Sequence, residues 1–348
     1  MDFRKHLILQ RDSIRDALAK LNILGIDAIL FVADEEDKLI GSLTDGDIRR
    51  GFVKGLTFET PILDYIQPNP VFIFQNDYDA IEQLELFQRK SLKIIPIVDR
   101  NHRIVDILNL RLKRSLLPLD TVLMAGGRGE RLSPLTDNCP KPLLKVGAKP
   151  IIEHNVDRLI NYGINRIIIS IRYLGDQIKA HFNNGAVKDI KIEYVEEENP
   201  LGTFGALSLV DSFNTDNILL MNSDLLTNID FADFYKSYIE SGADLMIASI
   251  PYQVKVPYAV LEINNGQVIS FDEKPTYSYY SNGGIYLFKK SLLEFMPSNT
   301  FFNATDFMEL LIAKKKKVIH YPILGYWLDI GRPDDFEKAQ NDIKHIKF

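Results

Sequence analysis

The chain has 348 residues, of which 46% are apolar and 25% charged, and it contains one cysteine. This length is typical of two domains that each bury a core, and a single cysteine excludes a disulfide framework. A formal net charge of −6 argues against broad attraction to a phosphate backbone. The N-terminus lacks the apolar stretch of a signal peptide, and the apolar run RIIISI is too short to cross a bilayer. We therefore expect a cytoplasmic protein with no nucleic-acid partner and no membrane segment.

Up to about Leu117 the sequence is an imperfect repeat of two similar units. A constant offset pairs Asp12 with Asp77 and Asp34 with Asp99. Each unit contains one helix followed by two short strands. The expected helices are 12–22 and 77–89, and the expected strands are 29–32, 39–43, 94–98 and 103–108. This order predicts a paired α+β module over residues 1–117.

The segment LIGSLTDGDIRR, residues 39–50, resembles the ligand-binding motif of CBS domains, which commonly bind adenine nucleotides or related ligands. Thr44 ends a strand, where its hydroxyl can reach a phosphate or ribose, and Asp47 opens the next helix, where it can accept bonds from ribose hydroxyls. The corresponding positions of the second unit are Asn109 and Leu112. Because leucine cannot hold a ribose, we expect at most one such site. The alternative is that Thr44 and Asp47 only cap the helix and that the module serves for dimerisation.

After Pro118, apolar strands and helices alternate. The expected strands are 121–125, 166–171, 190–196 and 217–221, separated by helices at 151–162, 174–183 and 202–213. This alternation predicts a Rossmann-like α/β domain over residues 119–348, with a mixed, mostly parallel sheet that binds ligands at the carboxyl ends of its strands. Four closer strands, at 245–250, 259–263, 268–271 and 284–288, are expected to form an antiparallel layer over a sugar-sized pocket.

A glycine-rich loop follows the first of these strands. Gly126, Gly127 and Gly129 allow the backbone N–H groups to turn inward and cradle an anion. A dinucleotide fingerprint would need glycine where Leu132 stands, and the lysine–serine pair of a Walker loop is absent. Together with Ala125, the three glycines are the phosphate-binding segment that we expect.

The pattern GGxGxRLxPLT at residues 126–136, followed by PKP at 140–142, resembles the opening of the sugar-1-phosphate nucleotidyltransferase family. The segments PLGT, NSD, EKP and GYWLDIG follow in that family's order and look most similar to guanylyltransferases of the GDP-mannose pyrophosphorylase type. The resemblance implies an enzyme that joins a sugar 1-phosphate to a nucleoside triphosphate, releasing pyrophosphate for nucleotide-sugar or surface-glycan biosynthesis. It favours GTP and leaves UTP, CTP and dTTP open. It also leads us to expect a homo-oligomer.

The resemblance implies which charged side chains contact the reacting phosphates and the metal. Arg131 and Lys141 would neutralise the triphosphate and the leaving pyrophosphate, while Lys274 would contact the sugar phosphate. Asp224 and Asp329 would bind Mg²⁺, which takes one or two carboxylates together with phosphate oxygens and waters. We hypothesise direct in-line attack on the α-phosphorus, without a covalent enzyme intermediate.

The remaining roles concern the base and the sugar. Gly202 and Thr203 would lie beside the base. The sugar-binding candidates are Tyr258, Glu273 and Asn282. Ala259 departs from the family pattern, because many relatives have glycine there, and the added methyl group is expected to narrow the sugar pocket.

An alternative from another class is a nucleotide sensor or scaffold that binds ligands without turnover. Such a protein would have lost part of the charged machinery, whereas this sequence keeps all of it. The residues concerned are Arg131, Lys141, Asp224, Lys274 and Asp329.

Overall fold

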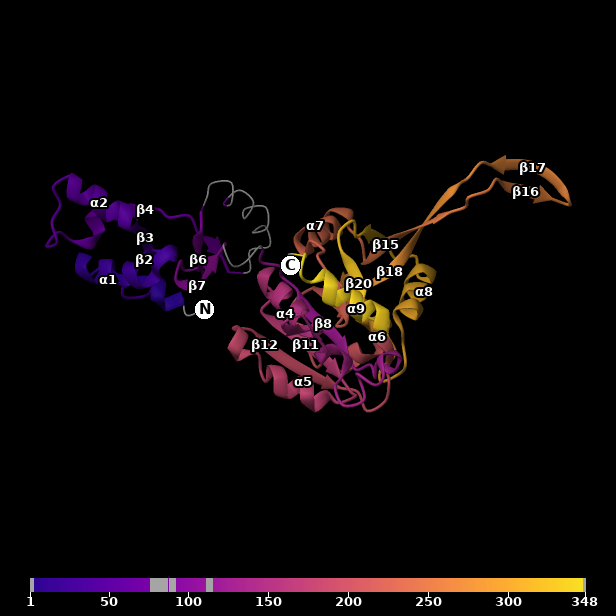
Figure 1. The fold of residues 1–348 in the computed structure, drawn as a ribbon. Helices are drawn as coiled ribbons and strands as arrows, with labels where there is room; N and C mark the ends of the chain where they lie inside the picture. Colours follow the sequence, from indigo (N-terminus) through magenta and orange to yellow (C-terminus); the bar gives the residue numbers. More distant parts are fainter. Residues whose placement is uncertain (1–2, 76–86, 88–91, 111–114, 347–348) are drawn as a thin grey trace. The chain divides into compact units, whose positions relative to one another are not determined.

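The chain divides into two units, Met1–Leu116 and Leu117–Phe348, and each has its own hydrophobic core. The computed structural model describes residues 3–75, 87, 92–110 and 115–346, and Figure 1 shows both units. Among these residues, no helix has the length and apolar character needed to cross a membrane.

The first unit contains two small sheets. One has the order β1-β2-β3-β4 and the other β5-β6-β7. The strands are β1 (Leu7–Leu9), β2 (Ile29–Ala33), β3 (Leu39–Thr44), β4 (Gln67–Pro68), β5 (Ile73–Phe74), β6 (Ile94–Val98) and β7 (Ile104–Asn109), and the helices are α1 (Ile14–Leu24) and α2 (Asp45–Val53). These bounds lie close to those expected from the repeat. The predicted helix 77–89, apart from Phe87, and position Leu112 lie outside the described residues.

The second unit is built on a seven-stranded sheet with the order β12-β11-β8-β13-β18-β15-β19. Its strands are β8 (Asp120–Ala125), β11 (Arg166–Ile171), β12 (Lys191–Glu196), β13 (Asn217–Asn222), β15 (Leu245–Lys255), β18 (Thr276–Lys289) and β19 (Val318–Pro322). Neighbours pair in parallel except at β18, which is antiparallel to both β13 and β15. The predicted mixed, mostly parallel α/β fold is therefore confirmed.

Helices and short two-stranded ribbons make up the rest of the second unit. The helices are α4 (Ile151–Asn161), α5 (Gly175–Phe182), α6 (Gly202–Gly205), α7 (Phe231–Ser241), α8 (Ala304–Ala313) and α9 (Pro333–Asp342). The two-stranded ribbons pair β9 (Lys145–Val146) with β10 (Lys149–Pro150), β14 (Leu225–Thr227) with β20 (Trp327–Asp329), and β16 (Val260–Asn264) with β17 (Gln267–Asp272). Every residue of β11 is buried, as expected of an apolar run inside a parallel sheet.

The strands expected to form a separate antiparallel layer are arranged differently. β15 and β18 belong to the central sheet, and both continue beyond it as an exposed two-stranded ribbon that carries β16 and β17 at its tip (Figure 1). We call residues 251–282 the arm. The layer over a sugar pocket that the sequence predicted is thus not present in this chain by itself, because the long pairing of β15 with β18 carries the segment away from the sheet.

Candidate active site

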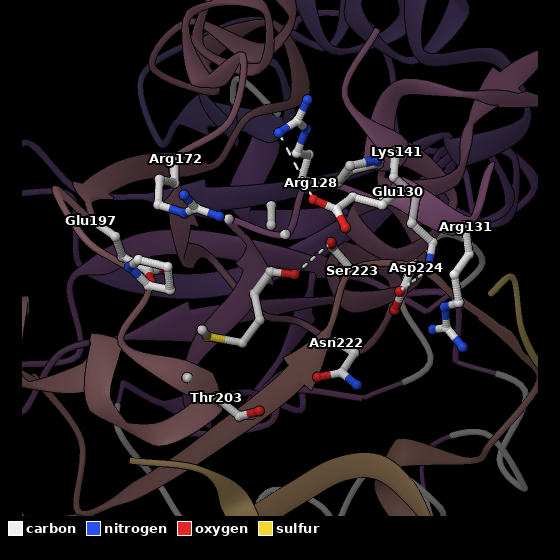
Figure 2. A pocket seen from close by; sticks show the side chains of 18 of the residues that line it. Arg128, Glu130, Arg131, Lys141, Arg172, Glu197, Thr203, Asn222, Ser223 and Asp224 are labelled. Carbon is white, nitrogen blue, oxygen red and sulfur yellow. Dashed lines mark hydrogen bonds and ion pairs between the residues drawn. The ribbon is translucent and has the colours of Figure 1, made fainter. Parts of the chain in front are cut away.

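A cavity of about 530 Å³ lies at the carboxyl ends of β8 and β13. This is the edge at which a parallel α/β sheet binds ligands. Figure 2 shows Arg131, Lys141 and Asp224 on one side of the cavity and Arg172 and Glu197 on the other. The predicted residues that line it are Ala125, Gly126, Gly127, Gly129, Arg131, Lys141, Gly202, Thr203 and Asp224.

The glycine loop forms one wall, and two of its glycines are required by close contacts. A Cβ atom at Gly126 would lie 2.7 Å from a carboxylate oxygen of Glu197. Gly129 has φ +68°, and a Cβ there would lie 2.9 Å from the Cβ of Lys141. A side chain at either position would displace a neighbour that lines the cavity. The loop can therefore present its backbone N–H groups to an anion at short range.

Lys141 joins the two predicted metal-binding aspartates. It lies in a 3-10 turn (Lys141–Leu143), its side chain is about 10% exposed, and its ammonium group contacts the carboxylate of Asp224. Its Nζ atom is 3.8 Å from Oδ1 of Asp329. The structure therefore brings together one cation and two acidic groups that lie far apart in the sequence.

Strand pairing explains why Asp224 and Asp329 meet. β14 begins just after Asp224, and β20 ends at Asp329, which is opposite Leu225 in the antiparallel register. The N–H of Ile330 also donates to the backbone carbonyl of Asp224 at 3.2 Å. Asp329 itself is not among the cavity-lining residues and adjoins the cavity through Lys141.

The environment of Asp329 suits a cation. Burial raises the pKa of Asp329, and the negative charge of Asp224 raises it further, against the opposing effects of Lys141 and Arg131. Its Oδ1 atom is buried and, within the part of the chain that the structure describes, accepts no hydrogen bond. Two adjacent carboxylates, one with an unsatisfied oxygen, form a donor set that fits a hard divalent cation.

A buried asparagine holds the backbone around Asp224. Asn155, in α4, donates from Nδ2 to the carbonyls of Ser223 and Leu225, at 3.1 and 2.9 Å. Ser223 in turn donates from its hydroxyl to the carbonyl of Met124, near the end of β8, at 2.6 Å. The two strand ends are therefore tied together. Sequence reasoning missed Asn155, although a polar residue among the apolar positions of 151–162 was a usable signal.

Glu197 holds together the part of the cavity wall that is expected to lie beside the base. Its carboxylate accepts a hydrogen bond from the Ser170 hydroxyl and another from the N–H of Leu201, the latter at 3.0 Å. Gly202, the next residue, has φ +74°, and a Cβ there would lie 2.9 Å from the carbonyl oxygen of Phe302. Glu197 was not predicted, because it is the middle one of three consecutive glutamates at the end of β12 and nothing in the sequence distinguishes it from the other two.

The expected helix 202–213 is shorter in the structure. The helix α6 ends at Gly205, and a 3-10 turn (Ala206–Leu209) follows it. The N–H groups of Phe204 and Gly205 donate to the carbonyl of Phe302. These bonds fix the segment against a distant part of the chain.

Two further cations, Arg128 and Arg172, line the cavity and were not predicted. The guanidinium of Arg128 lies over the ring of Tyr173, 5.5 Å from its centroid. Phe301 adds an apolar side chain, 57% exposed, to the cavity wall.

The predicted sugar-side residues are not in the cavity of this chain. Tyr258, Glu273 and Lys274 lie on the exposed arm. Asn282, at the base of the arm, donates to the Tyr286 hydroxyl at 2.7 Å. The structure thus brings together the residues expected at the triphosphate and separates them from those expected at the sugar.

In the first unit, Thr44 and Asp47 form a capping box at the start of α2. Burial would raise the pKa of Asp47, but hydrogen bonds from Thr44, Gln67 and Arg50 hold it below its usual value. The carboxylate already accepts bonds from these three residues. The capping role is therefore observed, and the ligand role stays a prediction.

Comparison with known proteins gives two family matches. A family described as "Nucleotidyl transferase" matches residues 120–346, and one described as "CBS domain" matches residues 8–54. The chain is 32% identical to a D-glycero-alpha-D-manno-heptose 1-phosphate guanylyltransferase of Aneurinibacillus thermoaerophilus, over 65% of this chain and 99% of that protein. It is 31% identical to a mannose-1-phosphate guanylyltransferase of Mycobacterium tuberculosis, over 65% of this chain and 64% of that protein.

Solved structures show the same similarity. A putative glucose-1-phosphate thymidylyltransferase of Bacillus anthracis, in complex with a sucrose, superposes with a TM-score of 0.54 at 25% identity, covering 66% of this chain and 97% of that one. HddC of Yersinia pseudotuberculosis, complexed with GMP-PN, superposes with a TM-score of 0.51 at 26% identity, covering 65% and 99%.

Proposed function

Because this chain belongs to the nucleotidyl transferase family, we propose that it condenses a sugar 1-phosphate with GTP to give a GDP-sugar and pyrophosphate. The observation that carries the proposal is the grouping of a glycine cradle with Lys141, Asp224 and Asp329 at one edge of the sheet. This grouping can accept a polyphosphate and a divalent cation together.

In the proposed reaction, an oxygen of the sugar 1-phosphate attacks the α-phosphorus of the triphosphate in line with the leaving group. The bond from the α-phosphorus to the bridging oxygen breaks, and pyrophosphate leaves. Both reactants are polyanions, so the work of the protein is to position them and to neutralise their charge. The glycine loop binds the phosphates, and Lys141 and Arg131 lie where negative charge develops.

The proposed metal is Mg²⁺, held by Asp224 and Asp329. When bound, it would neutralise charge on the phosphate oxygens. The ammonium group of Lys141 contacts one of these carboxylates and lies near the other. Lys141 and a divalent cation would therefore compete for the negative charge of the same two carboxylates.

GTP is favoured over other triphosphates because several similar proteins are named guanylyltransferases. Relatives named for UTP and thymidylyl transfer keep the base choice open to experiment. We expect GTP to give the highest kcat/KM when pyrophosphate release is measured with Mg²⁺ across the common nucleoside triphosphates and a panel of hexose, hexosamine and heptose 1-phosphates. A clear preference for UTP, CTP or dTTP would contradict the base assignment and leave the reaction class intact.

We also propose a cytoplasmic homo-oligomer whose first unit senses an adenine nucleotide through Thr44 and Asp47. AMP or ATP is then expected to slow amide hydrogen exchange in residues 39–50 of the full chain, because a bound ribose would add contacts at the start of α2. GTP serves as the control for binding at the second unit. Unchanged exchange in this segment at saturating adenine nucleotide would leave helix capping as the role of Thr44 and Asp47.

A further inference from the structure

The arm exposes more large apolar side chains than any other segment that the structure describes. Eleven lie between residues 252 and 280, whereas elsewhere such residues are scattered singly or in small groups. They are Tyr252, Val254, Tyr258, Leu261, Ile263, Val268, Ile269, Phe271, Tyr277, Tyr279 and Tyr280. An exposed patch of this kind marks an interaction site rather than ordinary surface.

In the half of the arm near the sheet, four of these side chains share one face. Residues directly opposite each other in an antiparallel pair lie on the same face, and alternate residues of a strand do as well. Tyr252 pairs with Tyr279, and Val254 pairs with Tyr277, so these four form one apolar face. The other face carries mainly polar pairs, such as Gln253 with Ser278 and Lys255 with Thr276.

The tip of the arm has the same division. Leu261 pairs with Phe271, and Ile263 pairs with Val268 beyond a β-bulge. The opposite face carries Glu262 with Ser270, whose hydroxyl donates to the Glu262 carboxylate, and Val260 with Asp272. Both halves of the arm therefore have one apolar face and one mainly polar face.

An isolated two-stranded ribbon is marginally stable in water, and an apolar face of this size needs a covering surface. The four apolar side chains of each half are between 37% and 64% exposed. Eight such half-exposed side chains can supply on the order of 800 Å² to an interface, about the share that one partner contributes to a stable complex.

We propose that the apolar faces of the two halves of the arm pack against the same faces on the arm of a second copy of this chain. Among the described residues, the surfaces that match these faces in apolar character are the faces themselves. Such self-complementarity is what a two-fold symmetric interface requires, because the same patch is used on both copies. This proposal does not depend on the reaction or on the choice of nucleotide.

The test uses the full chain and a paired substitution that spares the hairpin. Leu261→Lys with Phe271→Thr replaces one cross-strand pair of an apolar face, introduces a strand-forming threonine and places like charges on both copies. Val260→Lys with Asp272→Thr makes the same replacements one residue away, on the opposite face. Sedimentation equilibrium should give the Leu261/Phe271 variant half the mass of the wild type and leave the control at the wild-type mass.

A wild-type monomer at tens of micromolar, or a Leu261/Phe271 variant with the wild-type mass, would overturn the proposal. Amide hydrogen exchange provides a measurement that needs no variant. Exchange within residues 251–282 of the wild type is expected to slow as the protein concentration rises through the association range. Exchange in the arm that does not depend on concentration, in a protein that does associate, would show that a different surface forms the interface.

Discussion

Asp224→Asn is expected to lower the turnover of pyrophosphate-releasing activity by at least about a thousand-fold, which corresponds to about 4 kcal/mol of activation free energy. The substitution preserves shape but removes one of the two negative charges available to a divalent cation. The Asp224 side chain is only 24% exposed, and its contact with Lys141 can be kept by the amide oxygen of asparagine. The fold should therefore survive, as judged by circular dichroism and thermal unfolding.

Asp230→Asn is the matched control for this prediction. The same aspartate-to-asparagine change is made here a few residues away from Asp224. Asp230 caps α7 and lies outside the cavity. Asparagine caps a helix as well as aspartate does, so activity and stability should both be retained. An Asp224→Asn enzyme with wild-type turnover and unchanged Mg²⁺ dependence would contradict the metal assignment.

Lys141→Met is expected to lower turnover by about a hundred- to a thousand-fold, the usual cost of losing one group that stabilises charge in a transition state. The same substitution should tighten binding of the divalent cation to the free protein. The ammonium group of Lys141 contacts the carboxylate of Asp224, so its positive charge opposes the binding of a cation there. Mn²⁺ binding followed by electron paramagnetic resonance measures this second effect without turnover.

Lys149→Met is the control, because Lys149 pairs with Asp157 at a site outside the cavity, with an N–O distance of 2.6 Å. It should leave both quantities unchanged. The account of Lys141 fails if its removal leaves kcat intact. Weaker Mn²⁺ binding would instead mean that Lys141 holds the carboxylates in place for the metal.

Local patterns predicted a large part of the second unit. The RIIISI run became the buried strand β11, and the glycine loop lies against the cavity as expected. Lys141 and Asp224 also lie in the cavity. These features depend on short segments whose conformation is set by nearby residues, so the sequence is sufficient to predict them.

Features that depend on distant pairings were harder to predict. The extension of β15 along β18 cannot be read from either strand alone, because each had a plausible shorter pattern. The role of Glu197 depends on Ser170 and Leu201 coming together around it. Asn155 likewise gains its role only when α4 packs beside the end of β13.

The position of the sugar-side residues could not be predicted for the same reason. The EKP triplet matched a pattern, but the pattern says nothing about how far the surrounding strands extend from the sheet. Glu273 and Lys274 lie on the arm, outside the cavity of their own chain. The contacts of Lys274 with the sugar phosphate and of Glu273 with the sugar therefore stay predictions.

The most direct test of the central claim is to incubate the wild-type chain with Mg²⁺, GTP and the panel of sugar 1-phosphates, and to identify the products by mass spectrometry. We predict a GDP-sugar formed in equal amount to the released pyrophosphate with at least one sugar 1-phosphate. The account would be contradicted if GTP binds to the protein but no nucleotide-sugar forms from any member of the panel, either with GTP or with another nucleoside triphosphate in its place.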